Sequence, residues 1–478
     1  MSEQSNGSNG KRLAVIGGGP GGYAAAFMAA DLGLEVTLID LEPNPGGVCL
    51  YRGCIPSKAL LHCAKIINDA VEAEHWGIRF GQPQIDLDKM RAGKDAVISK
   101  MTGGLGQLCK ARRIQYVQGR ANFEESRVIK VTSDSGKEQI INTDTTILAA
   151  GSRPASLPDM LIESDRVMNS TTALQIPGIP KSLLVIGGGY IGLEIGSVYA
   201  ALGTKVTVVE MTDGLLPGAD RDLVKILAKQ MDHVFDRVLL QTKVKKLSEE
   251  KDGIAVTLES VDGKAKKEKF ERVLVSVGRR PNSSGLGLNN TTVTVNAKGF
   301  VEVDLQRRTS DPAIFAIGDI AGEPMLAHKA SHEGRIAAEV VAGHNVAFEP
   351  RAIPAVVFTD PEIAWCGLTE AQATAENRDV EIARFPWGAS GRASTLNRSD
   401  GLTKLLTDPE SGQVLGVGIV GPGAGELISQ GVLAIEMGAT ASDVGLSIHP
   451  HPTLSETIME TADLIFGHGT HIYKPKKA

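Results

Sequence analysis

The sequence has few of the features that mark membrane, nucleic-acid-binding or secreted proteins. No apolar run reaches the roughly 18 residues that a membrane-spanning helix needs. Lysine and arginine are scattered along a chain whose formal net charge is −6, so neither nucleic-acid binding nor a membrane location is expected. Only 5 of the 478 residues are cysteine, which excludes a secreted scaffold built on disulfides.

The N-terminal segment also lacks targeting features. Residues 1–10 are polar and contain neither the apolar segment of a signal peptide nor an Arg-rich transit pattern. We expect a disordered tail on a cytoplasmic protein. The chain of 478 residues exceeds what one hydrophobic core usually serves, and its ordinary globular composition indicates several folded domains.

Two of the cysteines lie close together, in the segment GGVCLYRGCIPSK from Gly46 to Lys58. If this segment is helical, Cys49 and Cys54 are separated by roughly 7.5 Å of axial rise, whereas a disulfide tolerates Cα atoms up to about 7 Å apart. A bridge therefore requires a distorted helix. Strained disulfides are more easily reduced and tend to be catalytic, so the pair is interpreted as a redox switch. Ordinary buried thiols are expected at Cys63, Cys109 and Cys366.

An internal repeat sets the expected architecture. The segment 12–40 (RLAVIGGGPGGYAAAFMAADLGLEVTLID) resembles the segment 182–210 (SLLVIGGGYIGLEIGSVYAALGTKVTVVE). Each predicts a strand, a Gly-rich turn, a helix of small residues and a second strand ending in a carboxylate, which is a βαβ nucleotide-binding unit. In both copies the carboxylate, Asp40 or Glu210, stands 18 positions after the third glycine (40 − 22 and 210 − 192). The signature glycines are Gly17, Gly19 and Gly22 in the first copy and Gly187, Gly189 and Gly192 in the second.

These turns predict two dinucleotide sites. The first glycine permits the tight turn, the second lets the backbone reach the pyrophosphate, and the third brings helix and strand together. The N-terminus of the following helix adds free N–H groups and a positive dipole. Asp40 and Glu210 should each accept hydrogen bonds from a ribose. Because a carboxylate repels a 2′-phosphate and no arginine occurs in 211–213, the second site is expected to bind NAD rather than NADP.

Gly-Gly before the first cysteine and Ile-Pro-Ser-Lys after the second resemble the active-site segment of the flavin disulfide reductases. This is the pyridine nucleotide-disulfide oxidoreductase family, and the similarity is greatest to its dihydrolipoamide dehydrogenase branch. Further resemblances extend over about residues 11–465. They include 149–154 with Gly151, 277–282 with Gly278, and 315–319, where Asp319 of the family's second FAD signature holds the ribityl chain.

The resemblance implies an α/β fold with two Rossmann-like domains, one for FAD and one for NAD, and an α+β C-terminal dimerisation domain. The FAD site is expected in the first repeat, just before the cysteines, and the NAD site in the second. The expected boundaries are 1–10 for the tail, 11–152 and 282–350 for the two parts of the FAD-binding domain, 153–281 for the NAD-binding domain and 351–478 for the dimerisation domain.

A histidine and a glutamate near the C-terminus could handle protons. His451 precedes a proline, which disfavours helical geometry, and Glu456 follows in the first turn of an expected helix, where it could orient the imidazole. Thr453 and Glu456 also fit a capping box, which gives the glutamate a purely structural alternative. The resemblance implies that His451 and Glu456 form an acid/base dyad contributed by the partner subunit. His449 is left out of the dyad, because an ordinary loop histidine explains it equally well.

Two charged residues stand beside packed, glycine-rich segments. Lys58 lies four residues after the second cysteine, and Glu194 two residues after the third glycine of the second repeat. Lone charges are rare in such surroundings. Paired beneath the flavin ring they would satisfy one another and place a positive charge near its reactive nitrogen, as the resemblance implies. The alternative is two independent surface charges.

The resemblance implies an enzyme that oxidises dihydrolipoyl groups carried by another protein and reduces NAD. That protein would be the lipoyl domain of an acyltransferase in a 2-oxo acid dehydrogenase complex, or the H protein of the glycine cleavage system. Cys49 is the expected interchange thiol, and Cys54 the thiol nearer the flavin. A homodimer is expected, and no metal site.

The alternatives are another reductase of the same family or a flavoprotein that only anchors an assembly. Glutathione reductases use NADPH, so arginines would be expected near Glu210 in a member of that group. Mercuric and large thioredoxin reductases carry an extra redox pair at the C-terminus, whereas 469–478 contain no cysteine. Tyr51 and Arg52 stand where this branch commonly has Asn-Val, a departure that bears on the substrate. The intact cysteine pair argues against an anchor.

Overall fold

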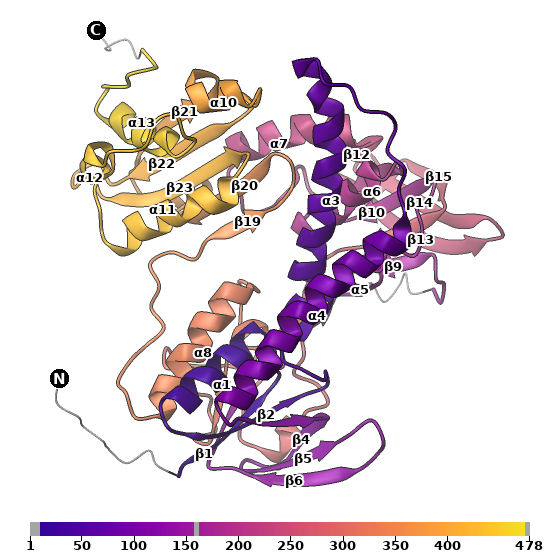
Figure 1. Ribbon diagram of the computed structural model, residues 1–478, viewed down its shortest axis with the longest axis vertical. Helices are drawn as coiled ribbons and strands as arrows, with labels where there is room; N and C mark the ends of the chain where they lie inside the picture. Colours follow the sequence, from indigo (N-terminus) through magenta and orange to yellow (C-terminus); the bar gives the residue numbers. More distant parts are fainter. Residues whose placement is uncertain (1–9, 157–161, 474–478) are drawn as a thin grey trace.

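The computed structural model describes residues 10–156 and 162–473. The predicted tail, 1–10, lies almost wholly outside the described residues. Three five-stranded sheets organise the chain, two of them parallel and one antiparallel (Figure 1). The predicted fold class, two nucleotide-binding βαβ units followed by an α+β unit, is confirmed. The domain boundaries given above stay predictions.

The first parallel sheet contains the first repeat. Its strand order is β18 (Ile314–Ala316), β7 (Thr145–Leu148), β1 (Arg12–Ile16), β2 (Glu35–Asp40) and β3 (Gln115–Gln118). Helices α1 (Pro20–Asp31) and α8 (Ala327–Val341) pack side by side against it (Figure 1). An antiparallel sheet of β4 (Arg120–Glu125), β5 (Val128–Thr132) and β6 (Glu138–Asn142) follows β3 in the chain. One edge strand and one covering helix therefore come from a segment far along the sequence.

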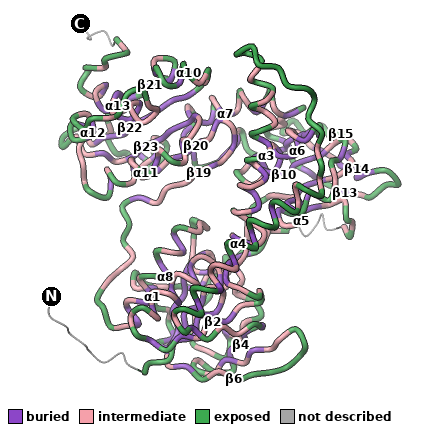
Figure 2. Tube along the Cα trace, in the orientation of Figure 1, coloured by how far each residue is buried: buried purple, intermediate pink, exposed green. Residues whose placement is uncertain are grey.

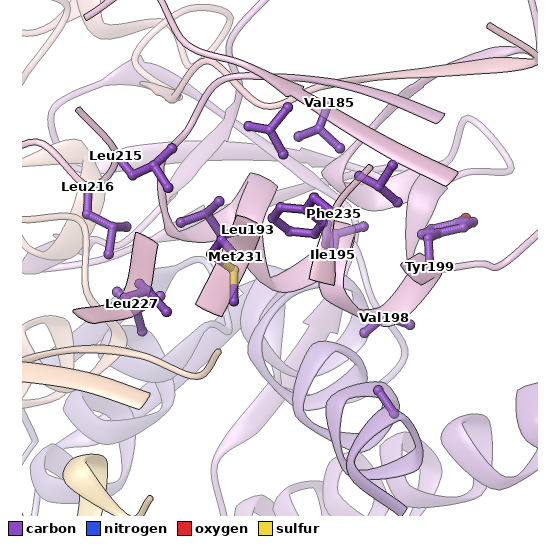
Figure 3. Packing of buried hydrophobic residues seen from close by; sticks show 14 of the residues in the cluster. Val185, Leu193, Ile195, Val198, Tyr199, Leu215, Leu216, Leu227, Met231 and Phe235 are labelled. Atoms are coloured by element: carbon purple, nitrogen blue, oxygen red, sulfur yellow. The ribbon is translucent and has the colours of Figure 1, made fainter. Parts of the chain in front are cut away.

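The second parallel sheet contains the second repeat. Its order is β12 (Arg237–Leu239), β11 (Lys205–Val209), β10 (Ser182–Ile186), β16 (Arg272–Val275) and β9 (Val167–Asn169). Its helices are α5 (Ser170–Ala173), α6 (Tyr190–Ala201) and α7 (Arg221–Val234), and its antiparallel extension is β13 (Thr242–Glu250), β14 (Gly253–Ser260) and β15 (Ala265–Phe270). Leu193, Met231 and Phe235 meet in its core (Figure 3).

Two short strands connect the parallel-sheet units. β8 (Ser152–Pro154) leads into the second unit and β17 (Arg279–Pro281) leads out of it, and they pair antiparallel. The segments that resembled domain crossings therefore lie next to one another.

The antiparallel sheet lies near the C-terminus. Its order is β19 (Ala355–Val357), β20 (Glu362–Gly367), β23 (Val414–Gly421), β22 (Leu402–Thr407) and β21 (Glu381–Pro386). The helices that accompany it are α9 (Glu370–Ala375), α10 (Gly391–Thr395), α11 (Ala424–Glu436), α12 (Ala441–Leu446) and α13 (Glu456–Ile465). Short 3₁₀ turns are η1 (Ala73–Trp76), η3 (Leu288–Asn290), η4 (Gly318–Ile320) and η5 (Trp387–Ala389).

Helices between β2 and β3 carry the cysteine pair. They are α2 (Gly47–Arg52), α3 (Cys54–Glu72) and α4 (Leu87–Ala111). α3 packs on α6 of the second unit, so it spans between the two parallel sheets (Figure 1). The connection between α3 and α4 is exposed (Figure 2). Among the described residues no helix is long and apolar enough to cross a membrane.

A buried ion cluster joins the second parallel-sheet unit to the antiparallel sheet. The Lys404 side chain on β22 has 0% exposure, and its Nζ lies 2.8 Å from Asp220, 3.0 Å from Asp222 and 2.6 Å from Glu370. Asp220 and Asp222 come from the start of α7, whereas Glu370 begins α9. Asp220 also accepts a hydrogen bond from the Glu370 N–H at 3.1 Å. One lysine thus neutralises carboxylates from two units.

We expect Lys404→Met to destabilise the protein by about 3 kcal/mol, because it leaves the buried carboxylate of Asp220 without its counter-charge, although Arg384 still pairs with Asp222 and Glu370. Differential scanning calorimetry would show this as a lower unfolding temperature. Lys65→Met is the matched control, because Lys65 pairs with Asp69 on the exposed face of α3 and such pairs contribute about 0–1 kcal/mol. Equal unfolding temperatures for the two variants would contradict this account of the cluster.

Candidate active site

The cysteine pair lies at a break between two helices. α2 ends at Arg52 and α3 starts at Cys54, with Gly53 at φ −138° and ψ −112° between them. The chain thus avoids the single distorted helix considered above. Cys49 is half-buried and Cys54 exposed, and both are free thiols. Of the three thiols expected to be buried, Cys109 and Cys366 are, but Cys63 is only half-buried, because it lies at the edge of the face of α3 that buries Leu60 and Ala64.

The two thiols differ in acidity. A hydrogen bond from the Cys49 thiol and the charge of Lys58 together lower the pKa of Cys54 to about 7, against the opposing effect of burial. The same hydrogen bond, together with burial, raises the pKa of Cys49. A helix N-terminus also favours a thiolate, and Cys54 is the first residue of α3. In the reduced pair Cys54 is therefore the thiol that loses its proton more readily.

Lys58 and Glu194 lie together one turn beyond Cys54. The Lys58 Nζ lies 2.8 Å from Glu194 Oε2, and Glu194 is 3% exposed. Ser57 Oγ donates to Oε2 at 3.0 Å, and the Phe358 N–H donates to Oε1 at 3.0 Å. Lys58 Nζ also stands 4.4 Å from the centre of the Phe358 ring. The buried carboxylate is thus held by groups from two separate parts of the chain, residues 57–58 and Phe358.

The sequence did not single out Ser57 or Phe358. Ser57 lies within the cysteine segment, and its position next to Lys58 was an available signal. Phe358 belongs to the segment after β19, and only the fold brings its backbone to Glu194.

The two glycine turns have the geometry that a bound dinucleotide requires. Gly17 has φ +102° and Gly187 φ +109°, in the region that favours glycine. A Cβ on Gly22 would lie 1.7 Å from the Gly17 oxygen, so α1 could not approach β1 with any larger residue there. By contrast, a Cβ on Gly189, the second signature glycine of the second turn, would meet nothing within 4 Å. The space beside Gly189 is therefore open to a ligand.

The repeats also match in their hydrogen bonds. The Gly18 N–H donates to Asp40, and the Gly188 N–H donates to Glu210 at 2.7 Å. The second oxygen of Asp40 accepts from the Glu42 N–H at 2.9 Å. Oε1 of Glu210 accepts from the N–H and the hydroxyl of Thr212 at 2.8 and 2.9 Å. Each carboxylate therefore holds its glycine turn, and in Glu210 the lone pair left for a ribose hydroxyl is on Oε2.

Asp319 lies in η4 beside the crossing strands. Ser152 Oγ donates to Asp319 Oδ2, and Arg279 Nε donates to Ser152 Oγ at 2.7 Å. Gly151 and Gly278 precede these strands with φ +67° and +109°. The structure thus brings together three segments, 151–153, 278–281 and 318–320, that the sequence had linked only by resemblance.

His451 and Glu456 lie together at the start of α13. His451 Nδ1 is 2.8 Å from Glu456 Oε1, and the Thr453 N–H donates to Oε2 at 2.7 Å. Although burial raises the pKa of Glu456, these two hydrogen bonds lower it overall. The glutamate therefore orients the imidazole with one oxygen and accepts a backbone N–H with the other. The predicted capping box does not form, because Ser455 rather than Thr453 precedes the first residue of α13 and no side-chain cap hydrogen bond is present there.

The dyad is separate from the thiols within one chain. The His451 side chain is 72% exposed, and no hydrogen bond or ion pair among the described residues joins it to Cys49 or Cys54. His449, left out of the predicted dyad, instead contacts Gln430 through Nε2 at 2.6 Å.

Comparison with known proteins decides the family. Residues 11–334 match the family described as pyridine nucleotide-disulphide oxidoreductase, and residues 353–462 match its dimerisation domain. The chain belongs to the pyridine nucleotide-disulphide oxidoreductase family. This membership confirms the resemblance noted in the sequence, and FAD and NAD are the cofactors that it implies.

Curated relatives and solved structures agree with this membership. The chain is 47% identical to a dihydrolipoyl dehydrogenase of Haemophilus influenzae, over 97% of each chain, and 46% identical to one of Vibrio cholerae, over 95% of this chain and 96% of that protein. The crystal structure of LpdA from Mycobacterium tuberculosis superimposes with a TM-score of 0.88 at 28% identity, covering 95% of this chain and 99% of the other.

In the reduced protein we expect Cys49→Ala to raise the pH midpoint of Cys54 thiolate formation above about 7, because the replacement removes the hydrogen-bond donor. A thiolate forms above its pKa, so the variant should hold less thiolate than the native protein just above that pH. Ultraviolet absorbance of the thiolate during a pH titration measures the midpoint. Cys63→Ala is the control and should leave it unchanged; an unchanged midpoint in Cys49→Ala would refute the assigned hydrogen bond.

Proposed function

We propose that this chain oxidises protein-bound dihydrolipoyl groups to lipoyl groups and reduces NAD⁺ to NADH through the Cys49–Cys54 couple and FAD. The observation that carries the proposal is the asymmetric thiol pair, with the more acidic thiol at a helix N-terminus four residues before the Lys58–Glu194 pair. The relatives named dihydrolipoyl dehydrogenase, 43–47% identical over nearly the full length, support this substrate.

The cofactors are assigned to the two glycine turns. FAD, when bound, carries two electrons from the cysteine pair to NAD⁺. The residues proposed to hold FAD are Gly17, Gly19, Gly22, Asp40, Lys58, Gly151 and Asp319. The residues proposed for the NAD side are Gly187, Gly189, Gly192, Glu194, Glu210 and Gly278. Lys58 and Glu194 are placed beneath the flavin ring, where Glu194 keeps the ammonium fixed and Lys58 presents the positive charge.

The proposed thiol chemistry follows from the two acidities. In the oxidised protein Cys49 and Cys54 form a disulfide, and a substrate thiolate attacks the Cys49 sulfur. That bond forms as the Cys49–Cys54 bond breaks, and Cys54 leaves as a thiolate, which its low pKa favours. The second substrate thiol then displaces Cys49, which leaves as a thiol because its pKa is raised. The substrate departs as a lipoyl disulfide and the cysteine pair is reduced.

His451 is proposed to take the proton of the first substrate thiol and pass it to Cys49 as Cys49 leaves, and then to hold the proton of the second substrate thiol, so that one proton ends on Cys49 and one on His451; Glu456 holds the ring through Nδ1. A neutral imidazole can do this near neutral pH. Because no hydrogen bond or ion pair in the described part of the chain joins the dyad to Cys49 or Cys54, the proposed site pairs Cys49 with His451 of the partner subunit, in a homodimer. The dimerisation domain at 353–462 supports this arrangement.

The proposed partner is a lipoyl-carrying protein, either the lipoyl domain of an acyltransferase in a 2-oxo acid dehydrogenase complex or the glycine cleavage H protein. The cytoplasmic location stays a prediction from the sequence.

The decisive experiment compares substrates with the purified protein. We expect NADH formation from dihydrolipoamide and NAD⁺, and little activity with glutathione disulfide and NADPH, because Glu210 repels a 2′-phosphate. A red-orange colour on adding dihydrolipoamide would report a thiolate next to flavin. A yellow protein indifferent to dithiols would instead be the non-catalytic anchor, and preference for glutathione would favour a glutathione reductase.

His451→Gln should lower kcat for dihydrolipoamide oxidation by about 10²–10⁴-fold, the usual contribution of a general acid–base group. The loss is expected because glutamine cannot accept the substrate proton. Steady-state kinetics measure it, and His449→Gln is the matched control two residues away, expected to retain near-native kcat. Equal activity of the two variants would remove His451 from the mechanism.

A further inference from the structure

A second buried ion cluster lies behind the 3₁₀ turn that carries Asp319. Glu333 on α8 is fully buried, and its Oε1 lies 2.9 Å from both Arg307 Nη1 and Lys329 Nζ. Its other oxygen, Oε2, accepts a hydrogen bond from the Gly318 N–H at 2.6 Å. One carboxylate therefore ties two cations to the first residue of η4.

Other contacts join the same helix to the same turn. Lys329 Nζ donates to the Gly322 carbonyl at 3.3 Å, just beyond η4. A Cβ on Gly318 would lie 3.0 Å from Ala330 Cβ, so the turn packs directly on α8. Gly318 has φ +72°, a conformation that glycine adopts readily. The shape of η4 is thus set from behind by α8.

The helix α8 also contacts the first glycine turn. A Cβ on Gly334 would lie 2.4 Å from the Gly21 oxygen, and Ser331 Oγ donates to the Pro20 carbonyl at 3.2 Å. Pro20 and Gly21 begin α1, the helix that the first glycine signature opens. One rigid helix therefore fixes the position of Asp319 relative to the first signature, although the two are separated by about 300 residues of sequence.

The cluster of Glu333, Arg307 and Lys329 is maintained at an energetic cost. Arg307 has φ +65°, which is unusual for a residue other than glycine. Its Nε is buried and has no hydrogen-bond partner among the described residues. Two cations face one carboxylate, so the cluster is not a neutral pair. A cluster serving only stability could be replaced by apolar side chains at little cost, which suggests a further role.

We propose that Glu333 is a positioning residue for FAD: through Gly318 it holds η4, and with it Asp319, at the distance from the first glycine turn that bound FAD requires. The inference rests on the proposed function only in taking Asp319 and the first signature as the FAD contacts. It does not depend on the dihydrolipoyl substrate.

Glu333→Asp is the direct test, because it keeps the negative charge but shortens the side chain by one methylene. The shorter carboxylate cannot meet both cations and the Gly318 N–H. We expect the full-length holoenzyme to release FAD about tenfold faster or more, as the loss of a hydrogen bond to a charged group predicts. Flavin fluorescence after dilution measures the rate, and far-ultraviolet circular dichroism establishes that the protein stays folded.

Lys404→Met is the control, because it removes a fully buried lysine from another cluster of carboxylates that does not contact η4. Its FAD release should stay within about twofold of native, even though its unfolding temperature falls. Rates for Glu333→Asp that match those of Lys404→Met would overturn the proposal and leave a purely stabilising cluster.

Glu333→Gln is the second test if Glu333→Asp does not fold. It keeps the length of the side chain but removes the charge that strengthens the hydrogen bond to the Gly318 N–H and that pairs with both cations, so FAD release should rise about fivefold. A native release rate in this variant would also overturn the proposal. Failure of the proposed function is recognised separately, because the unmodified protein would then hold FAD but form no NADH from dihydrolipoamide.

Discussion

The break at Gly53 is the constraint on which the site depends. It ends α2 and lets α3 begin at Cys54, so that the more acidic thiol lies at the positive end of a long helix while Cys49 remains on the preceding one. One turn further along α3, Lys58 meets the buried carboxylate of Glu194. The helix therefore carries both the redox pair and the fixed positive charge, and its packing on α6 connects them to the second nucleotide unit.

Buried charges connect separate parts of this protein. Lys58 with Glu194 joins α3 to α6, and Lys404 with three carboxylates joins α7 to the antiparallel sheet; in both cases the partners come from segments distant in the sequence. Glu333 with two cations instead joins α8 to η4 within one unit. Because a buried charge without its partner is costly, such contacts specify one arrangement of the units, which hydrophobic packing alone specifies less sharply.

The duplicated unit shows how one local design is used twice. In both copies the residue after the first glycine donates to the carboxylate at the end of the second strand, and the third glycine allows the helix to contact the turn. The copies then differ in their surroundings. The first is completed by β18 and α8 from far along the chain, whereas the corresponding edge strand of the second is β9, which precedes the repeat in the chain. The same backbone solution is thus used in two different surroundings.

The sequence by itself determined whatever depends on neighbouring residues. Spacing and residue type identified both βαβ units, the cysteine pair and the short-range pairing of His451 with Glu456, because each is local in the chain. The tertiary structure alone decided which distant groups meet: Phe358 on Glu194, Ser152 and Arg279 on Asp319, and Glu333 on Gly318. Such contacts have no local signature, since any buried carboxylate could find its donors in many ways. Only the completed packing of the sheets and helices selects one of them.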